Sequence, residues 1–294
     1  MAISKDTTQI GFIGTGIMGG HMARHLQAAG YKLHVYNRTK AKTDALVAGG
    51  ATWHDSPGAV AAESDVVISM VGFPKDVEET YLGAGGVVER AKKGAILIDM
   101  TTSSPALAKR IAEAAAKKGV SSLDAPVSGG DVGARDAKLS IMVGGDKAAF
   151  DAALPIFQLM GANIMLLGTA GAGQHTKMCN QIIIASTLSG VAEGISYAKR
   201  TGLDPVEVLK CIGGGAAASF QLNVLGNRML EGNFEPGFFM EHFIKDLTIA
   251  TEEAASFDTK LDSLQLAKSK LEALAKKGYG RKGTQALYKH YNPD

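Results

Sequence analysis

The sequence contains very little cysteine. Among its 294 residues the only cysteines are Cys179 and Cys211, and no CxxC pair or Cys/His grouping occurs. Such a chain offers no basis for a disulfide framework or a zinc site, and it fits a reducing compartment. We therefore expect no bound metal and no structural disulfide.

Long hydrophobic runs and an excess of charge are also missing. The apolar run from Ile182 to Leu188 is interrupted by polar residues and is too short to span a bilayer. The first residues, MAISKDTTQIGFIG, contain no signal-peptide hydrophobic region. The net charge is only +2, with acidic and basic residues interspersed. This balance does not predict the basic surface patch that binds nucleic acid. We expect a cytoplasmic protein that binds neither nucleic acid nor membranes.

Short aliphatic segments bounded by turns are abundant. Seven of them are candidates for buried strands: Ile10–Ile13, Leu33–Tyr36, Val66–Met70, Ile96–Asp99, Ser121–Asp124, Leu139–Val143 and Ile164–Leu167. Helix-like segments alternate with these strands over the first half of the chain. The alternation predicts an α/β domain with a doubly wound, mostly parallel sheet.

The alternation stops near Gly168, and helical patterns follow. Apolar residues then recur at spacings of three and four up to about Arg200, which predicts one long helix. Asp204-Pro205-Val206-Glu207 supplies the cap, proline and glutamate of a helix start, and helical patterns continue to Tyr291. We predict an α/β domain over residues 1–168, a long interdomain helix, and an all-helical substrate and oligomerisation domain over residues 169–294.

A glycine-rich turn follows the first predicted strand. Its residues, Gly14-Thr15-Gly16-Ile17-Met18-Gly19, form a GxGxxG between a strand and a helix. Glycines make the turn tight and let backbone N–H groups approach a pyrophosphate at the helix N-terminus. The first domain is therefore predicted to be a Rossmann domain that binds a dinucleotide through these six residues.

The end of the second predicted strand bears on which dinucleotide is bound. It reads Asn37-Arg38-Thr39, without the Asp or Glu that usually bonds the ribose hydroxyls of NAD. Arg38 can pair with a 2′-phosphate, while Asn37 and Thr39 add neutral hydrogen-bonding groups. The pattern favours NADP and leaves NAD open.

Two further segments combine glycine with polar side chains. Gly168 to Gln181 reads GTAGAGQHTKMCNQ, and its Lys177, Asn180 and Gln181 share one helical face. An ammonium and carboxamides at the start of a helix suit chemistry at a carbonyl oxygen. The other segment, Asp124 to Gly130, reads DAPVSGG at the end of a predicted strand. Its Ser-Gly-Gly can expose consecutive N–H groups to an anion such as a carboxylate.

Four segments in one order resemble a known family. They are GFIGTGIMGGHMARHL, DAPVSGGDVGA, GTAGAGQHTKMCNQ and the later PGF…KDL, which ends in Lys245-Asp246-Leu247. The chain is similar in these segments to the β-hydroxyacid dehydrogenases. That family includes 3-hydroxyisobutyrate dehydrogenase, tartronate semialdehyde reductase and the glyoxylate/succinic semialdehyde reductases. Three departures from the family pattern weaken assignment to one subfamily. The chain has Ala137-Lys138 where many members have Gly-Thr, and Gln181 where some members have Asn. Its C-terminal tail also lacks an aspartate that is common there in the family.

The resemblance implies a role for each matching residue. Lys177 would be the general acid/base of a hydride-transfer reaction. Ser128, Gly129 and Gly130 would bind the substrate carboxylate, and Asn180 and Gln181 would position the substrate. The cofactor would be lined by Met70, Val71 and Thr102 and reached by Lys245.

The resemblance also implies an activity. It is an oxidoreductase that transfers a hydride between NADP(H) and a small carboxylate-bearing semialdehyde or 2-oxo acid. An NAD-preferring 3-hydroxyisobutyrate or L-serine type dehydrogenase is one alternative, and a noncatalytic NADP-binding module is another. A homodimer or homotetramer is expected from the resemblance. The sequence does not select one substrate or the physiological direction.

Overall fold

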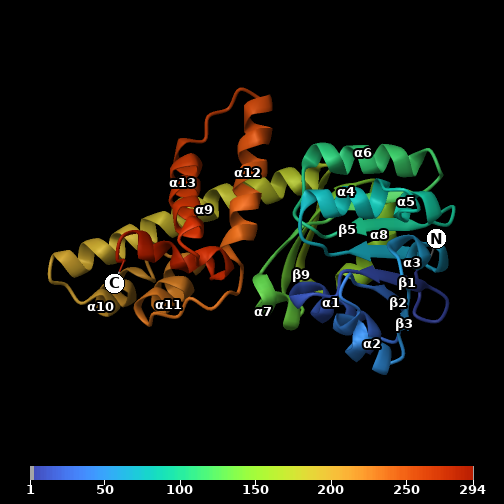
Figure 1. Cartoon of the computed structure of the whole chain (residues 1–294), viewed down its shortest axis with the longest axis horizontal. Coiled ribbons are helices and arrows are strands. Elements are labelled where there is room, and N and C mark those ends of the chain that lie inside the picture. Colours follow the sequence, from blue (N-terminus) through green and yellow to red (C-terminus); the bar gives the residue numbers. More distant parts are fainter. Residues whose placement is uncertain (1–2, 294) are drawn as a thin grey trace. The chain divides into compact units, whose positions relative to one another are not determined.

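The computed structural model describes residues 3–293 and contains two compact units. The first unit ends at Lys177 and the second begins at Met178. The first is an α/β unit and the second is helical, as the sequence pattern predicts. Figure 1 shows the elements of both units. The boundary predicted at residue 168 is nine residues earlier in the chain than this division and stays a prediction.

A single sheet forms the centre of the first unit (Figure 1). Its order is β3-β2-β1-β4-β5-β6-β8-β7, with β9 also paired to β8, and the pairs from β3 to β6 are all parallel. β8 runs antiparallel to β6 and to β7. The strands are β1 (Gln9–Ile13), β2 (Lys32–Tyr36), β3 (Thr52–Trp53), β4 (Val66–Ser69), β5 (Ile96–Asp99), β6 (Ser121–Asp124), β7 (Val127–Ser128), β8 (Leu139–Gly145) and β9 (Gly161–Gly168).

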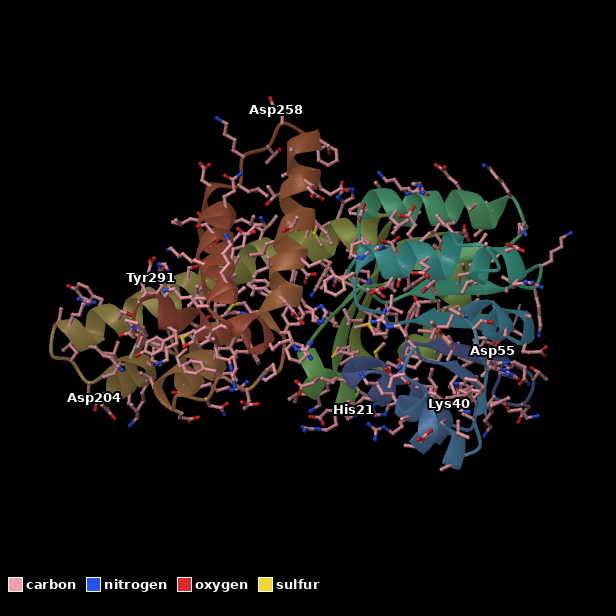
Figure 2. All side chains as sticks on the ribbon, in the orientation of Figure 1. His21, Lys40, Asp55, Asp204, Asp258 and Tyr291 are labelled. Carbon is pink, nitrogen blue, oxygen red and sulfur yellow. The ribbon has the colours of Figure 1, made fainter. Side chains whose placement is uncertain are left out.

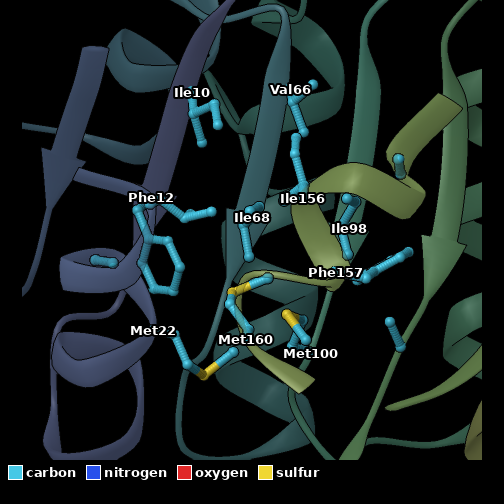
Figure 3. Close-up of a cluster of buried hydrophobic side chains, with 14 of the residues drawn as sticks. Ile10, Phe12, Met22, Val66, Ile68, Ile98, Met100, Ile156, Phe157 and Met160 are labelled. Carbon is cyan, nitrogen blue, oxygen red and sulfur yellow. The ribbon is translucent and has the colours of Figure 1, made fainter. Parts of the chain in front are cut away.

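Helices cover both faces of this sheet because successive side chains of a strand point to opposite faces. Ile10 and Phe12 of β1 belong to one core cluster, whereas Ile13 belongs to the other. Figure 3 shows the first cluster, in which Met22 of α1 and Phe157 of α8 meet the strands. The helices of this unit are α1 (Ile17–Ala28), α2 (Asp44–Ala48), α3 (Pro57–Glu63), α4 (Pro74–Leu82), α5 (Val87–Arg90), α6 (Pro105–Ala116), α7 (Gly130–Arg135) and α8 (Lys147–Phe157), with the 3-10 turn η1 (Lys40–Thr43).

Local sequence accounts for where several of these helices begin. Three of them, α3, α4 and α6, have proline at the first helical position, where its missing N–H is not needed. Ser56 and Ser104 cap α3 and α6 by accepting from the N–H groups of Ala59 and Leu107, each at 3.3 Å. Such caps stop each helix from extending into the turn that precedes it.

The second unit contains helices only among its described residues. Its first helix, α9 (Ala172–Arg200), starts within the first unit and has 29 residues. Asp204, labelled in Figure 2, caps the next helix by accepting from the N–H of Val206 at 2.8 Å. The other elements are α10 (Pro205–Ile212), η2 (Gln221–Gly226), α11 (Asn227–Leu230), α12 (Met240–Ser256), α13 (Asp262–Lys276), η3 (Tyr279–Arg281) and η4 (Thr284–His290).

The core of the second unit is built around α9. Leu188, Ala192 and Ile195 of this helix are buried with Phe243 of α12 and Leu271 of α13. Tyr291 is bound to α9 and α13, since it donates to Glu193 at 2.7 Å and accepts from Lys270 at 2.5 Å. None of the described helices is long and apolar enough to cross a membrane.

Candidate active site

The glycine turn between β1 and α1 lies against the end of β4. Gly14 has φ +92°, and a Cβ at this position would collide with the carbonyl oxygen of Met70. A Cβ on Gly19 would collide with the carbonyl oxygen of Gly14, which fixes the approach of α1 to β1. Gly16 has open space where its Cβ would stand. The turn is therefore packed on its inner side and open at Gly16, as a pyrophosphate-binding turn requires.

The other predicted residues of this turn differ in exposure. Thr15 is buried, and its Oγ1 donates to the carbonyl of Lys42 at 3.1 Å. The side chain of Ile17 is 59% exposed, while Met18 is half-buried against the core. Ile17 is therefore the apolar side chain that the turn presents outwards.

Asn37 uses both ends of its carboxamide inside the protein. Its Oδ1 accepts from the N–H of Thr15 at 3.0 Å, and its Nδ2 donates to the carbonyl of Thr39 at 2.9 Å. Asn37 therefore holds the glycine turn to the end of β2. Arg38 beside it is 88% exposed, with Nη1 3.6 Å from Oδ1 of Asp76. An ion pair so exposed holds the guanidinium only weakly.

A buried polar network follows β4 and β5. Oγ of Ser69 donates to Asp99 at 2.8 Å and also lies 2.8 Å from Oη of Tyr81. The N–H of Thr101 donates to the same Oδ1 of Asp99 at 3.1 Å, and Oγ1 of Thr101 accepts from Val71 N–H at 3.0 Å. Burial raises the pKa of the Asp99 carboxyl to about 6, against hydrogen bonds from Thr101 and Ser69 that lower it. Through these bonds the segments containing Val71 and Thr102 are joined.

Asp124, at the end of β6, binds the start of α9. Its Oδ1 accepts from the N–H of Gly171 at 2.7 Å, and its Oδ2 accepts from the N–H of Gln174 at 2.8 Å. Burial raises the pKa of this carboxyl to about 6, although these two N–H groups lower it. Gly171 has φ +92°. Glycine is needed at 173 because a Cβ there would lie 2.5 Å from the backbone oxygen of Asp124. The glycines of GTAGAGQ therefore allow the start of α9 to pack directly against the end of β6.

Lys177 follows this anchored turn. Gln174, three residues earlier, is fully buried and binds the segment after β5: Oε1 accepts from Ser103 N–H at 2.9 Å and Nε2 donates to the Thr101 carbonyl at 2.8 Å. Lys177 is itself buried, with 6% of its surface exposed. Thr102, predicted to line the cofactor, lies half-buried between the two residues that Gln174 binds. Gln174 therefore binds the segment containing Thr102 to the helix that carries Lys177.

The predicted carboxylate site lies where β7 passes into α7. Ser128 is half-buried and paired with Ser140 of β8, while Gly129 and Gly130 have φ +131° and +63°. A turn conformation of this kind can expose successive N–H groups to an anion. The far end of α7 is held by His25, whose Nε2 lies 3.0 Å from the carbonyls of Ala134 and Arg135.

The predicted site residues of the second unit are connected through Asp246 by hydrogen bonds and an ion pair. Nδ2 of Asn180 donates to Oε1 of Gln181 at 2.7 Å, and Nε2 of Gln181 donates to Asp246 at 2.6 Å. Nζ of Lys245 lies 2.9 Å from Asp246. Gln181 and Asp246 are buried, while Asn180 and Lys245 are partly exposed. The Gln181 carboxamide is therefore engaged within the protein at both ends.

Asp124, Gln174 and Asp99 were not singled out from the sequence. Each binds groups that are distant in the chain, and no local pattern marks such a contact. Among residues 3–293 no cluster of three His, Cys, Asp or Glu side chains could hold a metal ion. His21 and His25 are spaced four apart, yet His25 binds backbone carbonyls and His21 lies beside Arg24.

Family models match both parts of the chain. Residues 9–168 match the family described as the NAD binding domain of 6-phosphogluconate dehydrogenase. Residues 171–291 match the family described as NAD-binding of NADP-dependent 3-hydroxyisobutyrate dehydrogenase. The two matches cover the glycine turn and the lysine segment respectively.

Individual relatives are similar over nearly their whole length. An uncharacterized oxidoreductase of Bacillus subtilis, YkwC, is 55% identical, over 95% of this chain and 97% of its own. The 2-hydroxy-3-oxopropionate reductase of Escherichia coli is 39% identical over 95% of each chain. Among solved structures, the 3-hydroxyisobutyrate dehydrogenase of Mycobacterium tuberculosis with L-serine has a TM-score of 0.88 and 28% identity, covering 96% of this chain and 98% of its own.

Proposed function

The chain belongs to the β-hydroxyacid dehydrogenase family, and from this premise we propose what it acts on, with which cofactor, and through which residues. It is an NAD(P)-dependent hydroxyacid dehydrogenase. We assign to it hydride transfer between NADP(H) and a small carboxylate-bearing semialdehyde or 2-oxo acid, or the corresponding hydroxy acid. Lys177 is the general acid/base.

The observation that carries this proposal is the buried Lys177 on an anchored helix. The first turn of α9 is bound to the ends of β5 and β6 through Gln174 and Asp124. Ligands of such sheets bind at the carboxyl ends of the strands. A buried amine at this edge of the sheet can be placed next to a bound substrate and can exchange a proton with it. A lysine exposed on a solvated helix face would not support this proposal.

The residues around the glycine turn fit a dinucleotide. The turn is closed by Met70 on its inner side and open at Gly16, so the N–H groups of Gly16 to Gly19 would hold the pyrophosphate. Val71 and Thr102 would line the nicotinamide side, and Lys245 would contact the cofactor. When bound, the nicotinamide supplies a hydride to the carbonyl carbon or accepts one from the alcohol.

Residues of the chain itself would bind the substrate's carboxylate and transfer the proton. Ser128, Gly129 and Gly130 would bind its carboxylate through their N–H groups and the serine hydroxyl. As the carbonyl is reduced, negative charge develops on its oxygen, and the Lys177 ammonium stabilises that charge and donates the proton. In the reverse direction the neutral amine takes the proton of the alcohol. Asn180 would position the substrate, and Gln181 would orient Asn180 through the bond between them.

Lys177→Ala tests the catalytic role. Turnover is expected to fall by about 10²–10⁴-fold, because the proton donor is lost, while NADPH binding measured by fluorescence titration is retained. Lys210→Ala, which removes an exposed lysine of α10, is the matched control and should keep full activity. Turnover of Lys177→Ala close to that of the wild type would exclude the mechanism.

The preference for NADP over NAD rests on the end of β2. No carboxylate follows this strand before Asp44, and the exposed Arg38 can turn toward a 2′-phosphate because its ion pair with Asp76 is weak. Arg38→Asp should therefore shift the ratio of kcat/KM values toward NADH. Arg200→Asp makes the same charge change at the exposed end of α9 and should leave the ratio unchanged. An unchanged ratio in Arg38→Asp would exclude the phosphate contact.

A substrate panel distinguishes the proposed class from its alternative. The panel contains glyoxylate, succinic semialdehyde, tartronate semialdehyde and methylmalonate semialdehyde, each with NADPH and NADH, and 3-hydroxyisobutyrate and L-serine with both oxidised cofactors. We expect the fastest turnover with a semialdehyde or 2-oxo acid and NADPH. Faster oxidation of 3-hydroxyisobutyrate or L-serine with NAD would favour the NAD-preferring alternative. L-serine is in the panel because the mycobacterial structure contains it.

Self-association is also proposed. The proposal rests on the family resemblance, and the exposed apolar side chains of Ile183 (66%) and Tyr197 (69%) on α9 are candidates for the interface. We expect a homodimer or homotetramer by light scattering, and a monomer at micromolar concentration would refute this. The cytoplasmic location, and the absence of nucleic-acid and membrane partners, stay predictions.

A further inference from the structure

Gln174 joins the helix that carries Lys177 to the segment after β5. Its fully buried carboxamide accepts from Ser103 N–H at 2.9 Å and donates to the Thr101 carbonyl at 2.8 Å. Only a side chain with both a donor and an acceptor can bind both groups of one backbone segment. Thr102 is consequently fixed on both sides by bonds to α9.

Gln174 and Lys177 are three positions apart, so their side chains leave α9 on the same face. Both side chains are buried, with 0% and 6% exposed. A shift of the helix start relative to Thr102 would therefore move the amine by a similar distance. Rates of proton and hydride transfer are sensitive to displacements of this kind, since about 1 Å of misplacement can lower a rate about 10²-fold.

Asp124 fixes the same turn from the other side. Its carboxylate accepts from Gly171 and Gln174, which precede and follow the first residue of α9. Oδ1 and Oδ2 are both used, so the helix start cannot rotate on the strand without breaking one bond. The absence of a Cβ at Gly173 allows the close approach, because a Cβ would meet the Asp124 backbone oxygen at 2.5 Å.

We propose that Gln174 and Asp124 are positioning residues for the reaction. Together they hold the first turn of α9 at the carboxyl ends of β5 and β6, and through it they place the Lys177 amine relative to the cofactor-lining segment at Thr102. This inference rests on the function proposed above, in which Lys177 transfers the proton. Neither Gln174 nor Asp124 needs to touch substrate or cofactor in this role.

Two substitutions remove the two contacts separately. Gln174→Met keeps the length of the side chain and loses both bonds to the 101–103 segment. Asp124→Asn keeps the size and one acceptor oxygen, but its amide NH₂ faces an N–H group. We expect either variant to lower kcat about 10–100-fold, with NADPH binding little changed. Asp124→Asn carries the test by itself if Gln174→Met fails to fold.

Asp146→Asn is the matched control. Asp146 also accepts from two N–H groups at a helix start in the first unit, those of Ala148 and Ala149 at 2.9 and 3.1 Å. Its helix, α8, carries no proposed site residue. The control should keep the wild-type kcat. If the Asp124 and Gln174 variants fold and also keep it, the proposal is overturned.

A second measurement separates positioning from general damage. In a Lys177→Ala background there is no amine to place, so adding Gln174→Met or Asp124→Asn should leave the residual turnover unchanged. Losses that multiply in this background would show that the two residues act by another route, and would overturn the proposal. High turnover of Lys177→Ala alone would refute the proposed function instead, and the positioning role with it.

Discussion

Asp99→Asn is expected to make the first unit more stable at neutral pH. The Asp99 carboxylate is buried at the end of β5, and burial raises its pKa from 3.8 to about 6. Each pKa unit corresponds to about 1.4 kcal/mol, so ionised Asp99 destabilises the folded protein by about 3 kcal/mol above pH 6. Asparagine carries no charge, and its Oδ1 can still accept from Ser69 and Thr101.

The sign of the pH dependence follows from the direction of the shift. The folded state binds the Asp99 proton more tightly than the unfolded state, so this group's contribution to stability is present below about pH 4 and is lost as the pH rises to about 6. The asparagine variant has no such loss. We therefore expect the two proteins to have similar stabilities near pH 4 and to differ by about 1–3 kcal/mol at pH 7.5.

Urea unfolding followed by tryptophan fluorescence provides the assay. Trp53 is the only tryptophan of the chain and belongs to β3 of the same unit as Asp99, so its signal reports on this unit. The difference between the two proteins isolates Asp99 from other titrating groups. A variant no more stable than the wild type at pH 7.5 would refute the reasoning. Asp124→Asn, whose two oxygens both accept N–H groups, should instead be destabilised at this pH.

Three further changes have expected outcomes. Gly173→Ala should lower the free energy of unfolding by about 1–3 kcal/mol, because its Cβ would overlap the backbone of β8 at Met142. Gly190→Ala lies in the same helix with open space around it, and it should raise the free energy of unfolding by about 0.5–1 kcal/mol. Thermal unfolding of the pair checks both, and equal midpoints would contradict the packing. Gln285→Met should cost about 1–3 kcal/mol, since the buried Gln285 donates to the carbonyls of Asn233 and Glu235; an unaltered melting curve would rule this out.

Much of the fold could be predicted from the sequence because its signals are local. All seven strands expected from aliphatic runs are present, and the long helix runs to Arg200 as its apolar spacing predicts. β3 and β7 escaped prediction because two residues are too few to show an alternating pattern. The antiparallel direction of β8 was also not apparent, since a strand's own side chains do not record the direction of its neighbour.

The candidate site could be proposed only where a local motif combines glycine with polar side chains. The glycine turn, Ser128 and Lys177 are singled out in this way, and their roles stay predictions. Asp124 lies in a recognised motif as well, yet its bonds to the start of α9 span 47 and 50 residues, and spacing alone does not indicate them. For Asn37 the residue type suggested a cofactor contact, whereas the fold uses its carboxamide to hold Thr15 and Thr39.

The anchoring of α9 has a consequence for its dynamics. Amide protons in the first turn of a helix usually exchange quickly with solvent, because they have no partner within the helix. In α9 the amide of Gln174, like that of Gly171 before it, is bound to a buried carboxylate, so exchange there requires the helix to separate from β6. The turn that frays first in most helices is thus among the most protected here, and the lysine beyond it is ordered by folding, before any substrate binds.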